Sequence, residues 1–168
     1  MNNPKIRIKV EGFGEMCAEL YPEVAPATVE NFLSLVRAKF FDGLIFHRVI
    51  AGFMIQGGGF DADFNHKETG SIKGEFAANG FPQNTLKHTK GVLSMARTSA
   101  PNSASSQFFI MHAPAPYLDG QYAAFGKVTE GLDTIDAIAT VPTTTKMWMY
   151  QDCPVDDVVI TTIEEITE

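Results

Sequence analysis

The alternation of apolar and polar residues begins with a pair of short strands. Residues 6–10 alternate between apolar and basic side chains, as in a strand that is buried on one face. A glycine-bearing turn over residues 11–15 separates them from a second strand-like run at 16–20. We therefore predict that the chain opens with a β-hairpin.

Apolar positions recur with helical spacing in two segments. The first covers residues 29–36 and follows Pro26, which suits the first turn of a helix because proline has no N–H to satisfy there. The second covers residues 132–139, and Pro142 ends it. Each predicted helix has one apolar face that must be buried against a core.

Short runs typical of strands fill most of the chain between and after these helices. They cover residues 44–50, 53–56, 91–96, 107–111, 123–128 and 158–166. Glycine, proline, asparagine and serine separate these runs. Two helices among many short strands favour a closed β-barrel whose open ends the helices cover, although the pattern alone also allows a sheet sandwich.

Length and charge narrow the class of protein. The 168 residues, 45% of them hydrophobic and 20% charged, predict one globular domain over residues 1–168. The net charge of −7 argues against binding to nucleic acid or to an anionic membrane surface. No apolar run approaches the ~20 residues of a membrane span. Residues 1–5 contain no apolar signal core, so we expect a cytoplasmic protein.

The sequence offers no pattern for a metal or a cofactor. Cys17 and Cys153 are too far apart for a ligand or redox motif, and the four histidines have no zinc-like spacing. The run 57–59 is Gly-Gly-Gly, but it lacks the order of a phosphate-binding loop, so we predict a turn or a close backbone approach. No G-x-S-x-G elbow surrounds a serine.

Several strands are expected to bring polar and aromatic side chains to one outer face. Strand alternation places Arg48 on the same face as Leu44 and Phe46. A lone Arg or Gln would simply face solvent, but exposed Met and Phe between polar groups indicate a binding surface. The residues expected to share this face are Arg48, Met54, Gln56, Gln107 and Phe109. The pattern indicates a groove and identifies no reaction.

Over essentially its full length the chain resembles the cyclophilins, a family of peptidyl-prolyl cis–trans isomerases. The matching segments are 46–58 (FHRVIAGFMIQGG), 91–96 (GVLSMA), 102–110 (NSASSQFFI), 118–120 (LDG) and 125–128 (FGKV). The resemblance implies a closed eight-stranded antiparallel β-barrel capped by two α-helices, with the substrate groove on its outer surface. It implies an enzyme that isomerises X–Pro bonds in polypeptides and assists their folding.

The resemblance also implies roles for particular residues. Arg48 corresponds to the catalytic arginine, Gln56 to the glutamine that contacts the substrate backbone, and Phe53 belongs to the catalytic set. The residues implied for the proline pocket are Phe53, Met54, Phe109 and Leu118, and those for the adjoining subsite are Ala96, Arg97 and Gln107.

Three substrate-binding positions depart from well-known eukaryotic members. Arg97 stands in place of Asn, Tyr117 in place of Trp, and Tyr122 in place of His, as in bacterial-type members. The tryptophan of sensitive members supplies a donor and a broad apolar face to cyclosporin. The resemblance therefore implies isomerase activity together with weakened cyclosporin binding.

The expected chemistry explains why an arginine is needed and a cofactor is not. Rotation about X–Pro is slow because the C–N bond is partly double, with a barrier of ~18–20 kcal/mol. A guanidinium aimed at the proline nitrogen favours the twisted state over both planar states. Two other interpretations remain: a proline-peptide binding module, and a small-molecule carrier, which the bulky strand residues disfavour. We expect a monomer acting on proline-containing polypeptides.

Overall fold

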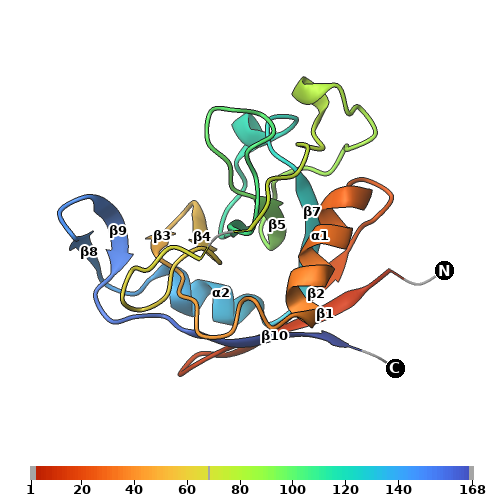
Figure 1. Ribbon diagram of the computed structural model, residues 1–168. Helices are drawn as coiled ribbons and strands as arrows, with labels where there is room; N and C mark the ends of the chain where they lie inside the picture. The colour runs from red at the N-terminus through yellow and green to blue at the C-terminus, as the bar shows by residue number, and fades with distance from the viewer. Residues whose placement is uncertain (1–2, 68, 167–168) are drawn as a thin grey trace.

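The computed structural model of the protein describes residues 3–67 and 69–166 (Figure 1). The domain predicted over residues 1–168 extends beyond both described ends, so its bounds stay a prediction. Within the described residues, eight strands form one antiparallel sheet in the order β10-β1-β2-β7-β5-β6-β4-β3. They are β1 (Lys5–Val10), β2 (Gly14–Leu20), β3 (Arg48–Ile50), β4 (Met54–Gly57), β5 (Val92–Met95), β6 (Phe108–Met111), β7 (Ala124–Glu130) and β10 (Ile160–Ile166).

The sheet curls until its outer strands, β3 and β10, approach each other. These two strands do not pair as a ladder. Instead, the irregular backbone before β3 bonds to residues 158–160, where the chain enters β10: the Phe46 N–H donates to the Val158 carbonyl at 3.0 Å, and the Ile160 N–H donates to the Leu44 carbonyl at 2.8 Å. The predicted fold class is confirmed, but the barrel is closed by isolated backbone hydrogen bonds and not by a ladder between β3 and β10.

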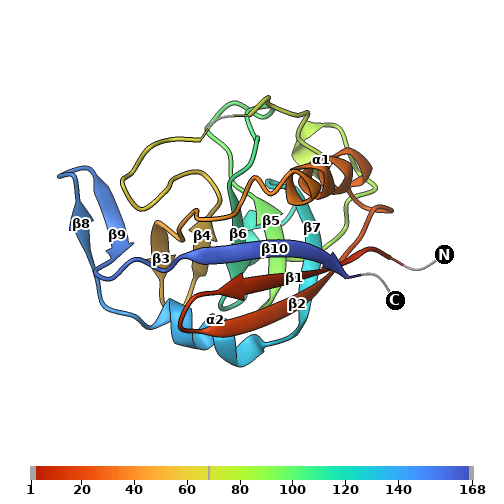
Figure 2. The ribbon, with the colours of Figure 1, turned by 60° about the horizontal axis from the view of Figure 1, so that its bottom comes forward.

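The two predicted helices cover opposite ends of this barrel (Figure 2). They are α1 (Pro26–Arg37) and α2 (Leu132–Ala139). Phe32 of α1 enters the core, where its ring centroid lies 5.1 Å from that of Phe125 and 5.4 Å from that of Phe108. None of the helices in the described chain has the length and apolar character needed to cross a bilayer. Two short 3-10 helices, η1 (Ala77–Asn79) and η2 (Pro116–Leu118), lie in the loops.

The face predicted for Leu44 and Phe46 was wrong. Both side chains are buried in the barrel core, whereas Arg48 is exposed. The reason is that the regular strand β3 begins only at Arg48. Residues 44–47 run as irregular backbone along the seam, so side-chain alternation does not carry through them.

One hairpin was not predicted. Strands β8 (Thr143–Lys146) and β9 (Tyr150–Pro154) pair with each other in a sheet of their own. The hairpin projects from the barrel, with β9 lying beside β3 (Figures 1 and 2). It therefore flanks the edge of the sheet that carries Arg48.

Candidate functional site

A row of polar side chains crosses the outer face of strands β3, β4 and the start of β6. Arg48 and Gln56 face each other across the β3–β4 pair, and an Arg48 Nη1–H donates to Gln56 Oε1 at 3.3 Å. Gln56 Nε2 in turn donates to Gln107 Oε1 at 3.0 Å. Gln107 lies directly over Gly59, where an added Cβ would stand 2.7 Å from its amide carbon. The close backbone approach predicted for the glycine run is present at Gly57 and Gly58, where an added Cβ would stand 2.7 Å from the Ile45 carbonyl oxygen and 2.9 Å from the Ser106 carbonyl oxygen.

An apolar hollow of about 140 Å³ opens beside this row. Met54 and Phe109 come from the neighbouring strands β4 and β6, and Leu118 comes from η2. The hollow is lined by Arg48, Phe53, Met54, Gln56, Ala96, Arg97, Phe109, Leu118 and Tyr122. Nine of the residues predicted for the site thus meet around one groove with a guanidinium at its rim.

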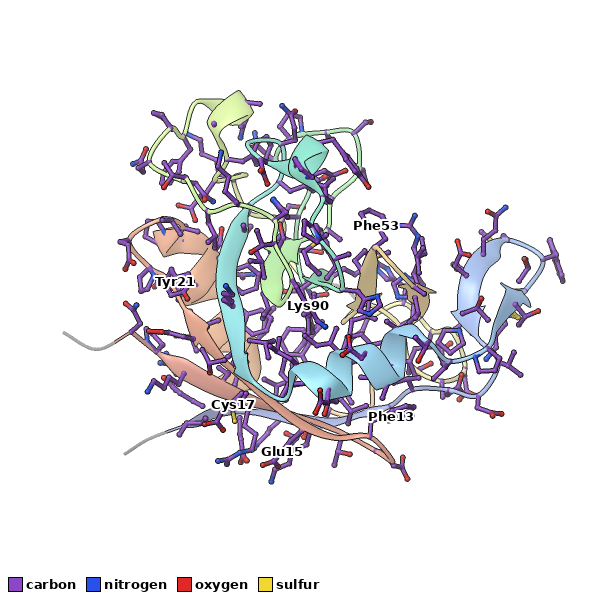
Figure 3. All side chains as sticks on the ribbon, turned by 180° about the vertical axis from the view of Figure 1, so that it is seen from behind. Phe13, Glu15, Cys17, Tyr21, Phe53 and Lys90 are labelled. Carbon is purple, nitrogen blue, oxygen red and sulfur yellow. The ribbon has the colours of Figure 1, made fainter. Side chains whose placement is uncertain are left out.

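Phe53 lies in the turn between β3 and β4, where Figure 3 labels it. His112 holds this turn in place: its Nδ1 accepts a hydrogen bond from the Gly52 N–H at 2.8 Å. The His112 N–H donates to the Phe53 carbonyl at 2.9 Å, and Nε2 lies 3.0 Å from Asp136 Oδ1 on α2. A helix at the barrel end therefore fixes the aromatic edge of the groove.

A buried histidine supports the floor of the groove. The His88 ring stacks on Phe109 with centroids 6.0 Å apart, and its two nitrogens lie 3.1 Å from Asp119 Oδ1 and 2.9 Å from Ser94 Oγ. Burial lowers the pKa of His88, although Asp119 opposes this effect. This role of His88 was not predicted from the sequence. The only signal was that Asp119 lies in the Leu-Asp-Gly segment of the cyclophilin match.

Arg97 forms a wall at the other side of the groove. Its Nε and Nη2 donate to the Gln121 carbonyl at 3.1 and 2.7 Å, and its guanidinium lies 4.6 Å from the Tyr122 ring and 4.8 Å from the Phe76 ring. Beyond it lies a second hollow of about 240 Å³. Ala96, Arg97 and Gln107, which were predicted to share a subsite, all line this second hollow.

Tyr117 is the predicted site residue that lines neither hollow. Its side chain is 70% exposed, and its ring centroid lies 6.1 Å from that of Phe53. It therefore stands at the rim of the groove, next to the apolar pocket.

The described residues contain no cluster of three or more His, Cys, Asp or Glu side chains arranged to hold a metal ion. Cys17 and Cys153 are both free thiols. The groove is thus built from two guanidinium groups, an amide, aromatic rings and aliphatic side chains.

Comparison with known proteins gives one consistent family. Residues 5–165 match the family described as "Cyclophilin type peptidyl-prolyl cis-trans isomerase/CLD". The chain is 45% identical to a peptidyl-prolyl cis-trans isomerase of Acinetobacter baylyi, over 96% of this chain and 85% of that protein. It is 43% identical to peptidyl-prolyl cis-trans isomerase B of Escherichia coli, over 89% and 93% of the two chains.

Solved structures agree with the sequence comparison. A cyclophilin-type isomerase of Cryptosporidium parvum superposes with a TM-score of 0.81 at 29% identity, covering 99% of both chains. A crystal structure described as that protein in the presence of the dipeptide Ala-Pro has a TM-score of 0.79 at 30% identity, covering 98% of this chain and 99% of that one.

Proposed function

The chain belongs to the cyclophilin-type peptidyl-prolyl cis-trans isomerases, and we propose that it catalyses rotation about X–Pro bonds through Arg48 and the apolar groove beside it. The observation that carries this proposal is the placement of one exposed guanidinium at the rim of a pocket sized for a small apolar ring. Proline-containing peptides are the substrates of the family.

The groove would hold the residues on the two sides of the rotating X–Pro bond differently. Met54, Phe109 and Leu118 offer apolar surface to the proline ring, and Gln56 offers an amide to the flanking backbone. With the ring held, the preceding carbonyl is the part that turns. Positioning of this kind contributes to the rate because only one geometry of the bound peptide is productive.

Arg48 would act on the twisted state. As amide resonance is lost, electron density collects on the proline nitrogen, and a guanidinium directed at that nitrogen stabilises the twisted state more than either planar state. The hydrogen bond from Arg48 to Gln56 orients the planar guanidinium toward the groove. Arginine suits this role because its charge persists at every physiological pH.

A pure binding module for proline peptides is the alternative. It would need the apolar pocket and the amides, but it would have no use for Arg48. The expectations of a monomer, of a cytoplasmic location and of one domain over residues 1–168 stay predictions.

The test is the turnover of Arg48→Ala on an X–Pro tetrapeptide. Arg48 is exposed, so we expect an unchanged circular dichroism spectrum and a loss of one to two decades in kcat/KM, as for a charged hydrogen bond worth about 1.5–3 kcal/mol. Arg37→Ala, at an exposed arginine on α1, is the matched control. Near wild-type turnover of folded Arg48→Ala would overturn the catalytic role of Arg48. No turnover by the wild type, with peptide binding retained, would favour the binding module.

A further inference from the structure

The tip of the β8–β9 hairpin exposes a continuous apolar patch. Met147 is 54% exposed, Trp148 92% and Met149 66%. In the chain as described, Trp148 makes no hydrogen bond and no ring contact. Contiguous exposed apolar side chains of this size mark an interaction surface more often than a structural one.

The backbone of this tip is unfavourable for the residues that occupy it. Met147 and Trp148 have φ angles of 50° and 46°, and the Met149 N–H donates to the Lys146 carbonyl at 3.2 Å, which closes a two-residue turn. Hairpin turns with two positive φ angles favour Asn-Gly, and a bulky residue in this region costs about 1–2 kcal/mol. Folding alone therefore gives no reason for Met and Trp at these positions.

The hairpin adjoins the groove through Arg48. A hollow of about 270 Å³ is lined by His47, Arg48, Met149, Tyr150, Gln151 and Asp152. Arg48 lines both this hollow and the apolar groove, so the two adjoin at Arg48. The second hollow, beyond Arg97, adjoins the groove through Gln56, Ala96 and Arg97 instead. A chain lying in the groove can thus leave it past Arg48 and reach the hairpin.

The hairpin is held firmly enough to act as part of the site. Tyr150 stacks on Phe64 with centroids 4.8 Å apart and packs on Phe60 at 5.3 Å. Lys146 Nζ, from the end of β8 next to the turn, lies 3.0 Å from Oδ1 of Asp157, which follows β9. The apolar tip is therefore presented beside β3 by fixed contacts.

We propose that this tip is an accessory docking site for the substrate polypeptide itself. This proposal rests on the proposed function. With its proline in the groove, an extended substrate would place an apolar side chain from one side of that proline against Trp148 and Met149. Methionine adapts to many shapes, so the patch accepts varied apolar segments such as unfolded proteins expose. Acidic or serine-rich segments offer no apolar area to this patch, so they should not dock there.

The test compares three peptides with the same X–Pro core: a tetrapeptide, a 15-residue peptide with apolar flanks, and one of equal length with acidic and serine flanks. The double variant Met147→Asn/Trp148→Gly keeps the hairpin, because Asn-Gly suits both positive φ angles. We expect roughly tenfold lower kcat/KM on the apolar-flanked peptide, the loss typical of one aromatic contact. Turnover of the tetrapeptide should stay within twofold. Val155→Ser, at an exposed apolar residue that lines neither groove nor hollow, is the control.

A second readout does not depend on catalysis. Trp148 is the only tryptophan in the sequence, so its fluorescence reports docking directly. We expect a blue shift with the apolar-flanked peptide, also in Arg48→Ala, and none with the acidic one. An unchanged spectrum, or equal kcat/KM losses on all three peptides, overturns the docking site. A fluorescence shift without turnover of any peptide would support docking and contradict the proposed catalytic function.

Discussion

Gly59 is expected to matter for catalysis because it leaves room for the Gln107 side chain. An alanine Cβ there would stand 2.5–2.7 Å from the Gln107 side chain, and Gln107 is flexible enough to move aside. Gly59→Ala should therefore keep the stability of the protein but break the Gln56–Gln107 hydrogen bond. A neutral hydrogen bond contributes about 0.5–1.5 kcal/mol, so we expect kcat/KM on an X–Pro tetrapeptide to fall roughly 2- to 12-fold.

Gly70→Ala is the matched control for this change, because an added Cβ at Gly70 meets nothing within 4 Å. Thermal melting of both variants separates stability from activity. Equal kcat/KM for Gly59→Ala and wild type would mean that the Gln107 end of the polar row takes no part in binding the substrate.

Tyr117 bears on cyclosporin, a ligand implied by the cyclophilin resemblance. The exposed Tyr117 ring offers less area than an indole and places its hydroxyl at a different reach. Tyr117→Trp should tighten inhibition tenfold or more, as expected for roughly 1–3 kcal/mol from an added donor and aromatic contact. Turnover without drug should stay unchanged, because Tyr117 lies outside the lining of the proline pocket. An unchanged inhibition constant would direct attention to Arg97 and Tyr122.

At the residue scale, the sequence identified the side chains that face the groove because contiguous motifs carry them. Arg48, Gln56 and Phe109 could be assigned in this way. The supports behind them were missed. His88 and His112 act through partners 31 and 24 residues away, and no local pattern encodes a hydrogen bond across such a separation.

At the element scale, helix α1 depends on a carboxylate from another part of the chain. Its N-cap residue, Ala25, has no side-chain hydrogen bond to offer. The buried Glu75 takes this role: Oε1 accepts the Thr28 N–H at 2.6 Å, and Oε2 accepts the Ala27 N–H at 3.2 Å. A carboxylate at this end also interacts favourably with the helix dipole.

Glu75→Gln should therefore lower the free energy of unfolding by about 1–3 kcal/mol, because it removes the charge and turns one acceptor into a donor facing an N–H. Urea denaturation measures this loss. Glu30→Gln, on the exposed face of α1, should change stability by less than about 0.5 kcal/mol. A loss of the same size in both variants would contradict the capping role.

Elements with a regular pattern were predictable, and those without one were not. Residues 132–139 were assigned correctly because the helical period and Pro142 agree. The β8–β9 hairpin was missed because Met147 and Trp148 occupy its turn, where the pattern expected of a hairpin would have Asn and Gly. The irregular seam at 44–47 was mistaken for part of a strand because its residues are as apolar as those of one.

At the scale of the whole molecule, a buried histidine lies at the seam where the two edges of the barrel sheet, β3 and β10, approach each other. His47 lies between the seam and Phe60, whose ring centroid is 4.8 Å from that of His47, and the histidine is 7% exposed. Within the described chain its Nδ1 has no hydrogen-bond partner. Burial, assisted by the nearby charge of Arg48, lowers the pKa of His47 from 6.5 to about 4.

This shift couples the stability of the barrel to pH. As the pH falls below 6.5, His47 becomes protonated in the unfolded chain, but in the folded chain it stays neutral until about pH 4. The free energy of unfolding should therefore fall as the pH is lowered from 6.5 to 4, and His47 should not change it above pH 6.5. His47 alone should contribute up to about 3 kcal/mol of that fall. His88 acts in the same direction, so the comparison must be with His47→Phe, which keeps a buried ring but cannot titrate. Urea denaturation between pH 7 and pH 4 should show a shallower decline for His47→Phe than for wild type, and parallel curves would rule out His47 as the source.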